Sequence, residues 1–171
     1  MTGEVTVYGW KRLCYDIDEG VINDADTSVI ILSTSGEPRW KYVDMFFDSL
    51  VLNYDDVIDG ADPYAYTDEM AARVATLVHS VEANISVTNL YVVCDYGESR
   101  SAGLAAAVIR YLGAEDLYLW DSAIYHPNPL VYRKTCAALG IEVTDEDISY
   151  LTEINQKTFR EAIPDRKKEE K

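Results

Sequence analysis

Short hydrophobic runs along the chain predict a buried β-sheet. Each run is rich in Val, Ile, Leu or aromatic residues and is bounded by polar, Gly-containing or Asp-containing clusters, as strands commonly are. One of these runs, residues 28–32, has no polar face, which predicts a central strand covered on both sides. The predicted strands cover residues 5–10, 28–32, 49–54 and 90–93.

Segments whose apolar residues recur every three or four positions predict helices. The clearest is 67–83, where Thr67 is the predicted N-cap and where Asp68 and Glu69 complement the positive end of the helix dipole. Its apolar stripe consists of Met70, Val74, Leu77, Val78 and Val81. Further helices are predicted within 102–112 before Gly113, within 114–125, from Asn128 to Gly140, and from Thr144 to Pro164.

These elements together predict an α/β fold. Residues 11–26 form a helix or a loop in this interpretation, 34–38 a turn, and 39–48 a helix or a crossing segment. We expect a single domain with a central, mostly parallel sheet flanked by helices. The expected domain covers residues 1–164, and a charged tail, 165–171, follows it.

The composition indicates a folded protein of one domain. With 171 residues, of which 48% are hydrophobic, the chain can bury a substantial core. No apolar run approaches the roughly 20 residues needed to cross a bilayer, and the first residues lack the pattern of a secretory signal. Three cysteines without metal-ligand spacing fit reduced thiols. We therefore expect a cytoplasmic protein that needs no metal or cofactor.

The chain is strongly acidic, with 30 acidic and 15 basic side chains and a net charge of −15. This charge argues against nucleic acid and anionic membranes as partners, because their phosphate groups would be repelled. A phosphorylated peptide would approach through the same field, which favours neutral or basic flanking residues. An acidic surface is also an ordinary means of keeping a protein soluble.

The stretch 90–103 holds the residues that point to chemistry. A predicted strand ends at Cys94, and Arg100 and Ser101 open the next helix. A strand, a tight loop and a helix N-terminus make an anion site, because loop N–H groups converge there and the helix dipole adds positive charge. The same groups favour the thiolate of a cysteine at the base of the loop. A guanidinium beside it can hold two anion oxygens, so the stretch predicts nucleophilic phosphoryl transfer.

The motif Cys-x-x-Gly-x-Ser-Arg-Ser at residues 94–101, called the Cys94 loop below, resembles the signature loop of cysteine-based protein tyrosine and dual-specificity phosphatases. The resemblance implies a dual-specificity-phosphatase-like fold and a phosphorylated protein or small aryl phosphate as substrate. It implies that Cys94 forms a phosphocysteine, that Arg100 holds the phosphate, and that the Ser101 hydroxyl helps the thiolate to leave. The implied phosphate-binding residues are Asp95, Tyr96, Gly97, Glu98, Ser99 and Arg100.

In the resembled family an upstream Asp protonates the leaving group from a loop that follows a strand. Residues 55–63, called the aspartate loop below, occupy that place. Asp56 is the predicted general acid, since a protonated Asp on a mobile loop suits proton transfer to a leaving oxygen. Because loop length varies, the alternatives Asp55, Asp59 and Asp62 stay open.

Two residues depart from the family pattern. Val93 stands where the family has a His that orients the loop and favours the thiolate, and Glu98 adds a carboxylate to a loop that binds a dianion. The alternative function is therefore a catalytically weak or inactive protein that binds phosphate or a phosphopeptide. A third hypothesis is a sulfurtransferase or an arsenate reductase. The preference for phosphotyrosine or phosphoserine and the oligomeric state stay open, and His126 is expected to pack in a turn.

Overall fold

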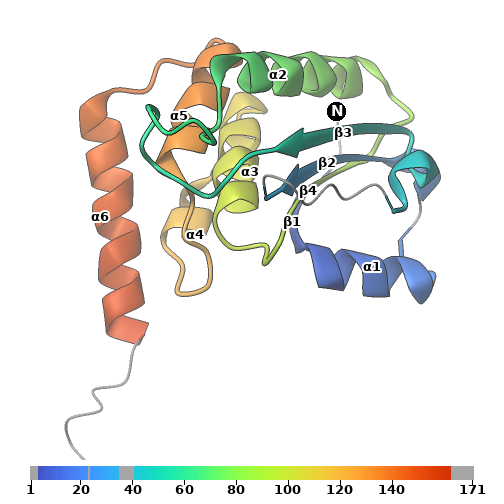
Figure 1. Cartoon of the computed structure of the whole chain (residues 1–171), viewed down its shortest axis with the longest axis horizontal. Helices are drawn as coiled ribbons and strands as arrows, with labels where there is room; N and C mark the ends of the chain where they lie inside the picture. The colour runs from blue at the N-terminus through green and yellow to red at the C-terminus, as the bar shows by residue number, and fades with distance from the viewer. Residues whose placement is uncertain (1–3, 23, 35–40, 163–171) are drawn as a thin grey trace, which may run out of the picture.

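A four-stranded, all-parallel sheet forms the centre of a single α/β domain (Figure 1), as the sequence predicts. The computed structural model describes residues 4–22, 24–34 and 41–162. The strand order is β1-β4-β2-β3, so β4 and β2 are the two interior strands. The strands are β1 (Glu4–Gly9), β2 (Thr27–Ser33), β3 (Asp48–Asn53) and β4 (Asn89–Cys94).

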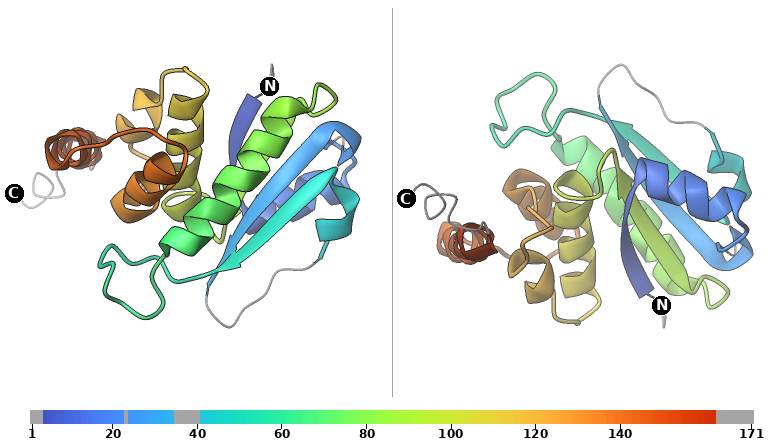
Figure 2. Two further views of the ribbon diagram at one scale, coloured as in Figure 1. Left: turned by 90° about the horizontal axis from the view of Figure 1, so that it is seen from above. Right: turned by 90° about the horizontal axis from the view of Figure 1, so that it is seen from below.

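Helices cover both faces of this sheet (Figures 1 and 2). In Figure 1, α1 lies below the sheet, and α2, α3 and α5 lie on its other face. Helix α6 lies outermost and packs on α4 and α5 (Figure 2). The α-helices are α1 (Trp10–Asp18), α2 (Asp68–Ala83), α3 (Arg100–Tyr111), α4 (Leu117–Trp120), α5 (Pro129–Ala138) and α6 (Asp145–Ala162). The short 3₁₀ helices are η1 (Asp24–Asp26) and η2 (Val43–Met45).

Alternate side chains of the interior strands enter two separate cores, because successive strand residues point to opposite faces. In β2, Ile30 and Leu32 pack toward α2, α3 and α5, whereas Val29 and Ile31 pack with Leu13 of α1. Every residue of β2 is buried, which confirms the prediction of a central strand covered on both sides. The same alternation in β4 directs Cys94 toward the face covered by α3 and its neighbour Val93 toward the α1 face.

The ends of several elements match the sequence prediction. Thr67 caps α2 by accepting a hydrogen bond from the Met70 amide, and Asn128 caps α5 ahead of Pro129. Gly113 and Gly140, both at positive φ, follow α3 and α5. The predicted turn at 34–38, apart from Thr34, and the tail at 165–171 lie outside the described residues.

The first strand lies one residue earlier than predicted, because β1 runs from Glu4 to Gly9 and Trp10 begins α1. The ambiguous stretch 39–48 contains the 3₁₀ helix η2 over the part that the structure describes. The change from strand to helix after Gly9 has a steric cause. Gly9 lies opposite Cys94 in the register of β1 and β4, and its backbone packs directly on the Cys94 loop.

Two glycines make that contact possible. Gly97 adopts φ +80°, and a Cβ on it would lie 2.5 Å from the Gly9 nitrogen. A Cβ on Gly9 would lie 2.6 Å from the Tyr96 carbonyl oxygen. The Trp10 amide, the first of α1, donates a hydrogen bond to the Asp95 carbonyl at 3.3 Å. The junction of β1 and α1 therefore supports the Cys94 loop through its backbone, at a distance that only glycine allows.

We expect Gly97→Ala to lower the free energy of unfolding by about 3 kcal/mol or more, because it adds both a strained φ and a backbone clash. Urea denaturation measures this. The matched control is Gly113→Ala, since Gly113 also has a positive φ, +75°, but no atom within 4 Å of an added Cβ. That substitution should cost only about 1 kcal/mol. Equal losses at the two positions would contradict the proposed contact.

Candidate active site

The sulfur of Cys94 lies at the base of the Cys94 loop, at the carboxyl end of an interior strand. The Gly97 amide donates a hydrogen bond to Sγ at 3.2 Å, and the Ser101 hydroxyl lies 3.0 Å from Sγ. Cys94 is 4% exposed and Ser101 is fully buried in the first turn of α3. Both groups stabilise negative charge on sulfur when they donate to it, as the N-terminus of α3 also does.

Arg100 begins α3 and lies almost entirely inside the protein. Its Nη1 donates to the Tyr54 carbonyl at 2.9 Å, just beyond the end of β3, and its Nη2 pairs with the Asp95 carboxylate. Burial opposes the charge of this guanidinium, but the hydrogen bond to Asp95 and the electrostatic interactions with Cys94 and Asp95 outweigh burial and raise the pKa of Arg100 above its ordinary value. The arginine therefore remains a cation beside the sulfur.

The ring of Tyr54 packs against the Arg100 guanidinium. Its ring centroid lies 5.9 Å from the guanidinium carbon and 4.9 Å from the ring of Tyr66. Burial, together with Tyr66, raises the pKa of Tyr54 well above its ordinary value. The phenol therefore stays neutral, and the aromatic face and the backbone carbonyl of the same residue both favour the arginine cation.

The side chain of Asp95 makes contacts that the sequence did not predict. Its Oδ2 accepts hydrogen bonds from Arg100 Nη2 and, at 2.7 Å, from the Thr34 hydroxyl at the end of β2. The resemblance implied that Asp95 belongs to the loop that binds phosphate. The structure places its carboxylate on the arginine of that same loop.

The aspartate loop reaches the Cys94 loop through Asp56. Its Oδ1 accepts hydrogen bonds from the Ser99 hydroxyl at 2.9 Å and from the Asn128 amide at 2.8 Å. Asn128 also donates to the Val57 carbonyl at 3.1 Å, and its side-chain oxygen caps α5. One asparagine therefore joins the aspartate loop, the Cys94 loop and the start of α5.

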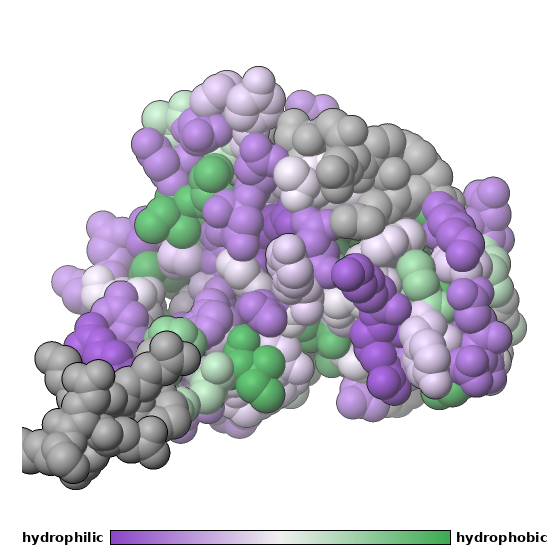
Figure 3. Space-filling view, turned by 60° about the horizontal axis from the view of Figure 1, so that its bottom comes forward, coloured by the Kyte–Doolittle hydropathy of each residue, from purple (hydrophilic) through white to green (hydrophobic). Residues whose placement is uncertain are grey.

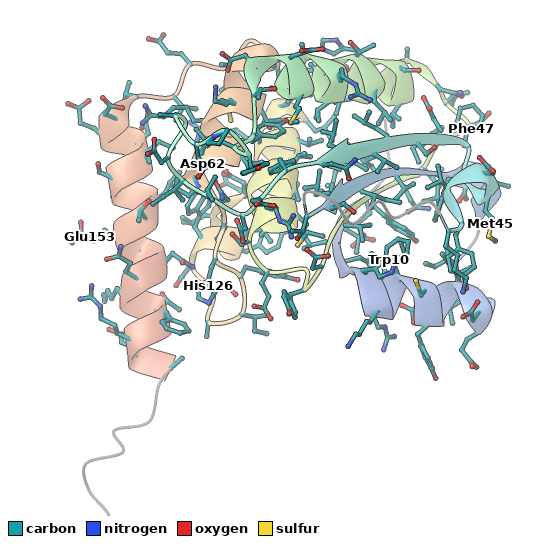
Figure 4. The ribbon with its side chains drawn as sticks, in the orientation of Figure 1. Trp10, Met45, Phe47, Asp62, His126 and Glu153 are labelled. Atoms are coloured by element: carbon teal, nitrogen blue, oxygen red, sulfur yellow. The ribbon has the colours of Figure 1, made fainter. Side chains whose placement is uncertain are left out.

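The other aspartates of this loop have local contacts. Asp59 Oδ1 accepts from the Ala61 amide at 2.9 Å, and Asp62 Oδ1 accepts from the Tyr64 amide at 2.8 Å. Figure 4 shows Asp62 well away from Trp10, the residue of α1 whose amide binds the Cys94 loop. The backbone of Asp55 pairs with Tyr64. The carboxylate of Asp56 is thus hydrogen-bonded to the Cys94 loop, whereas Asp59 and Asp62 accept from amides of nearby residues in their own segment.

The remaining loop side chains face outward. Tyr96 is 84% exposed, and Glu98 is exposed next to it. The Glu98 carbonyl accepts from the His126 amide at 2.8 Å, while the His126 ring packs edge-on against Phe159. His126 therefore supports the loop through its backbone, while its ring packs on α6 rather than in a turn. On the face shown in Figure 3, hydrophilic residues dominate and hydrophobic ones form small separate groups.

Three supporting residues were missed as parts of the site: Thr34, Tyr54 and the amide of Asn128. Thr34 stood in a predicted turn and Tyr54 in a predicted strand, so neither carried a signal of its own. Asn128 was predicted only as an N-cap, although a buried Asn has donors that a cap does not use.

Neither a metal centre nor a membrane span is found in the described part of the chain. Within residues 4–22, 24–34 and 41–162, no cluster of three or more His, Cys, Asp or Glu side chains is arranged to hold a metal ion. In those same ranges no helix combines the length and hydrophobicity that crossing a bilayer requires.

Comparison with known proteins gives only low similarities. No protein-family model matches the sequence, and no curated protein matches it significantly. Among solved structures, PTPMT1 in complex with PI(5)P is 14% identical with a TM-score of 0.42, and covers 93% of this chain and 94% of its own. The human tyrosine phosphatase-like serine/threonine/tyrosine-interacting protein is 17% identical with a TM-score of 0.38, at 87% and 85% coverage. A further PTPMT1 structure is 15% identical with a TM-score of 0.36, at 94% and 92% coverage. At these identities and TM-scores the neighbours carry no argument about function, so the function has to be inferred from the residues of this chain.

We expect Asn128→Ala to lower the free energy of unfolding by about 2 kcal/mol, because it removes the cap of α5 together with the hydrogen bonds that the side chain donates to Asp56 and to the Val57 carbonyl. Thermal or urea denaturation measures the loss. Thr67→Ala is the control, since it removes an exposed cap with a single hydrogen bond to Met70 and should cost about 1 kcal/mol or less. A loss at Asn128 no larger than that at Thr67 would contradict the linking role.

Proposed function

We propose that this protein is a cysteine-dependent phosphomonoester hydrolase, a protein tyrosine phosphatase of the dual-specificity-like kind. The observation that carries the proposal is the environment of Cys94 Sγ. The sulfur accepts a hydrogen bond from the Gly97 amide, lies 3.0 Å from the Ser101 hydroxyl, and interacts electrostatically with the buried Arg100, which begins α3. Such a site stabilises both a thiolate and the oxygens of a phosphoryl group.

The reaction proceeds in two steps in this proposal. The Cys94 thiolate attacks phosphorus, and the S–P bond forms as the bond to the leaving oxygen breaks. Asp56 donates its proton to that oxygen. A water molecule then attacks the phosphocysteine, its proton passes to the Asp56 carboxylate, and orthophosphate is released as the S–P bond breaks. A hydrogen bond from Ser101 to sulfur stabilises the departing thiolate.

Asp56 has the right contacts for the acid–base role. Both of its hydrogen bonds, from Ser99 and Asn128, end on Oδ1, which leaves Oδ2 for the transferred proton. The two donors also fix the carboxylate relative to the Cys94 loop, and this fixed position is what proton transfer within hydrogen-bond reach requires.

A phosphate-binding protein without turnover is the second candidate. The pairing of Arg100 with Asp95 favours it, because the cation that would hold a phosphoryl group is already compensated. Val93, which is fully buried against the α1 face, also supplies no polar group behind the sulfur. Phosphate or phosphopeptide binding without a trapped phosphocysteine would support this candidate over the enzyme.

We expect Cys94→Ser to lower the hydrolysis of an aryl phosphate by about 10³-fold or more, because it removes the nucleophile. Arg100→Lys, which keeps the charge but loses the planar fork, should lower kcat/KM by about 10²-fold. Cys14→Ser, on α1, is the control and should keep wild-type activity. Mass spectrometry of acid-quenched wild-type enzyme should show phosphate on Cys94. Full activity of Cys94→Ser would disprove the mechanism.

We expect Asp56→Asn to lower kcat by about 10²-fold on phenyl phosphate, with a smaller loss on p-nitrophenyl phosphate. The physical reason is that p-nitrophenolate is a stable leaving group that needs little protonation, whereas phenolate needs a proton donor. Asp62→Asn is the matched control in the same loop. A larger, leaving-group-dependent loss at Asp62 would assign the acid there instead.

A further inference from the structure

The Asp95 carboxylate lies on the edge of the Arg100 guanidinium that an oxyanion would need. Nε and Nη2 share one edge of this planar group, and an anion held through two parallel N–H bonds uses such an edge. Nη1 is committed to the Tyr54 carbonyl, and Nη2 is paired with Asp95. Nε is buried and has no hydrogen-bond partner among the described residues. The edge is therefore half occupied, by a carboxylate from the loop itself.

This contact is well shielded from solvent and fixed from a second side. The Arg100 and Asp95 side chains are 5% and 14% exposed, so the attraction between them is only weakly screened. The Thr34 hydroxyl donates to the same Oδ2 at 2.7 Å and lies 3.4 Å from Nη2. Thr34 therefore holds Asp95 against the arginine.

We propose that Asp95 is a specificity-determining residue that competes with the phosphoryl group for Arg100. A phosphate monoester gains both donors of the Nε–Nη2 edge only by displacing the carboxylate from Nη2, and its own negative charge then lies close to Asp95. The wild-type protein accordingly binds dianionic oxyanions more weakly than its Cys94 loop would allow without that carboxylate. This inference rests on the proposed function, because it assumes that the anion binds in the Cys94 loop.

The test measures anion binding without turnover. Cys94 is alkylated with the neutral reagent iodoacetamide while inorganic phosphate is titrated, and mass spectrometry gives the phosphate concentration that protects half of the protein. We expect Asp95→Asn to lower this concentration by about tenfold or more, which is the effect of releasing one charge-assisted hydrogen bond. The KM for an aryl phosphate should fall in the same proportion, with kcat changed much less.

Two further variants separate the contact from general charge effects. Glu98→Gln removes an equal charge from an exposed position of the same loop, so it measures the field alone and should shift protection by only about twofold. Thr34→Val keeps both charges but removes the hydroxyl that holds Asp95. It should tighten phosphate binding by less than Asp95→Asn does, and it tests the inference if Asp95→Asn does not fold.

The outcomes distinguish this inference from the proposed function. Unchanged or weaker protection of Asp95→Asn, with wild-type protection that Arg100→Lys abolishes, would overturn the inference and leave the anion site intact. Equal shifts for Asp95→Asn and Glu98→Gln would also overturn it, since charge alone would then explain the effect. Absence of phosphate protection in every variant would overturn the anion site and the inference together.

Discussion

The packing of Gly9 on Gly97 is the constraint on which the site depends. A tight loop that directs an amide such as that of Gly97 toward the sulfur needs a neighbouring backbone to pack against at van der Waals distance. The parallel register places Gly9 opposite Cys94, and the missing side chains let the end of β1 serve as that surface. The Trp10 amide then binds the Asp95 carbonyl. The geometry around the sulfur thus originates in a strand that is remote in sequence.

A buried arginine is the second requirement, and it is an expensive one in a folded protein. Transfer of a guanidinium out of water costs several kcal/mol unless hydrogen bonds and charge compensate it. Here the Tyr54 carbonyl, the Tyr54 ring and the Asp95 carboxylate supply that compensation without a ligand. The same carboxylate that stabilises Arg100 therefore opposes an incoming anion in our proposal. Stability and anion affinity are opposed at this one side chain.

Local sequence patterns were sufficient for most of the fold. The unbroken apolar run of β2, the Thr67 and Asn128 caps and the motif at residues 94–101 each depend on neighbours in the chain, and a pattern can show such dependence. The contacts among Asp95, Arg100 and Thr34 and the contact between Asp56 and Asn128 could not be predicted in this way, because they join the ends of different strands and helices. Of these four hydrogen bonds, all but the one between Arg100 and Asp95 join residues more than 60 positions apart. The early end of β1 was missed for a related reason, since Gly9 is constrained by the loop after β4 rather than by its own segment.

The hydrogen bond between Asp56 and Asn128 ties the proposed acid to the start of α3. Ser99, one residue before Arg100, donates to the same carboxylate oxygen as the Asn128 side chain. The backbone N–H of Asn128 in turn donates to the Ser99 carbonyl at 3.2 Å. Gly103 allows this close approach, since a Cβ there would lie 2.6 Å from the Asn128 carbonyl oxygen. These contacts therefore join the first turn of α3 to Asp56 both directly, through Ser99, and through Asn128. The proposed nucleophile, the arginine and the proposed acid thus belong to one connected set of backbone and side-chain contacts, which is the arrangement that the proposed two-step displacement at phosphorus requires.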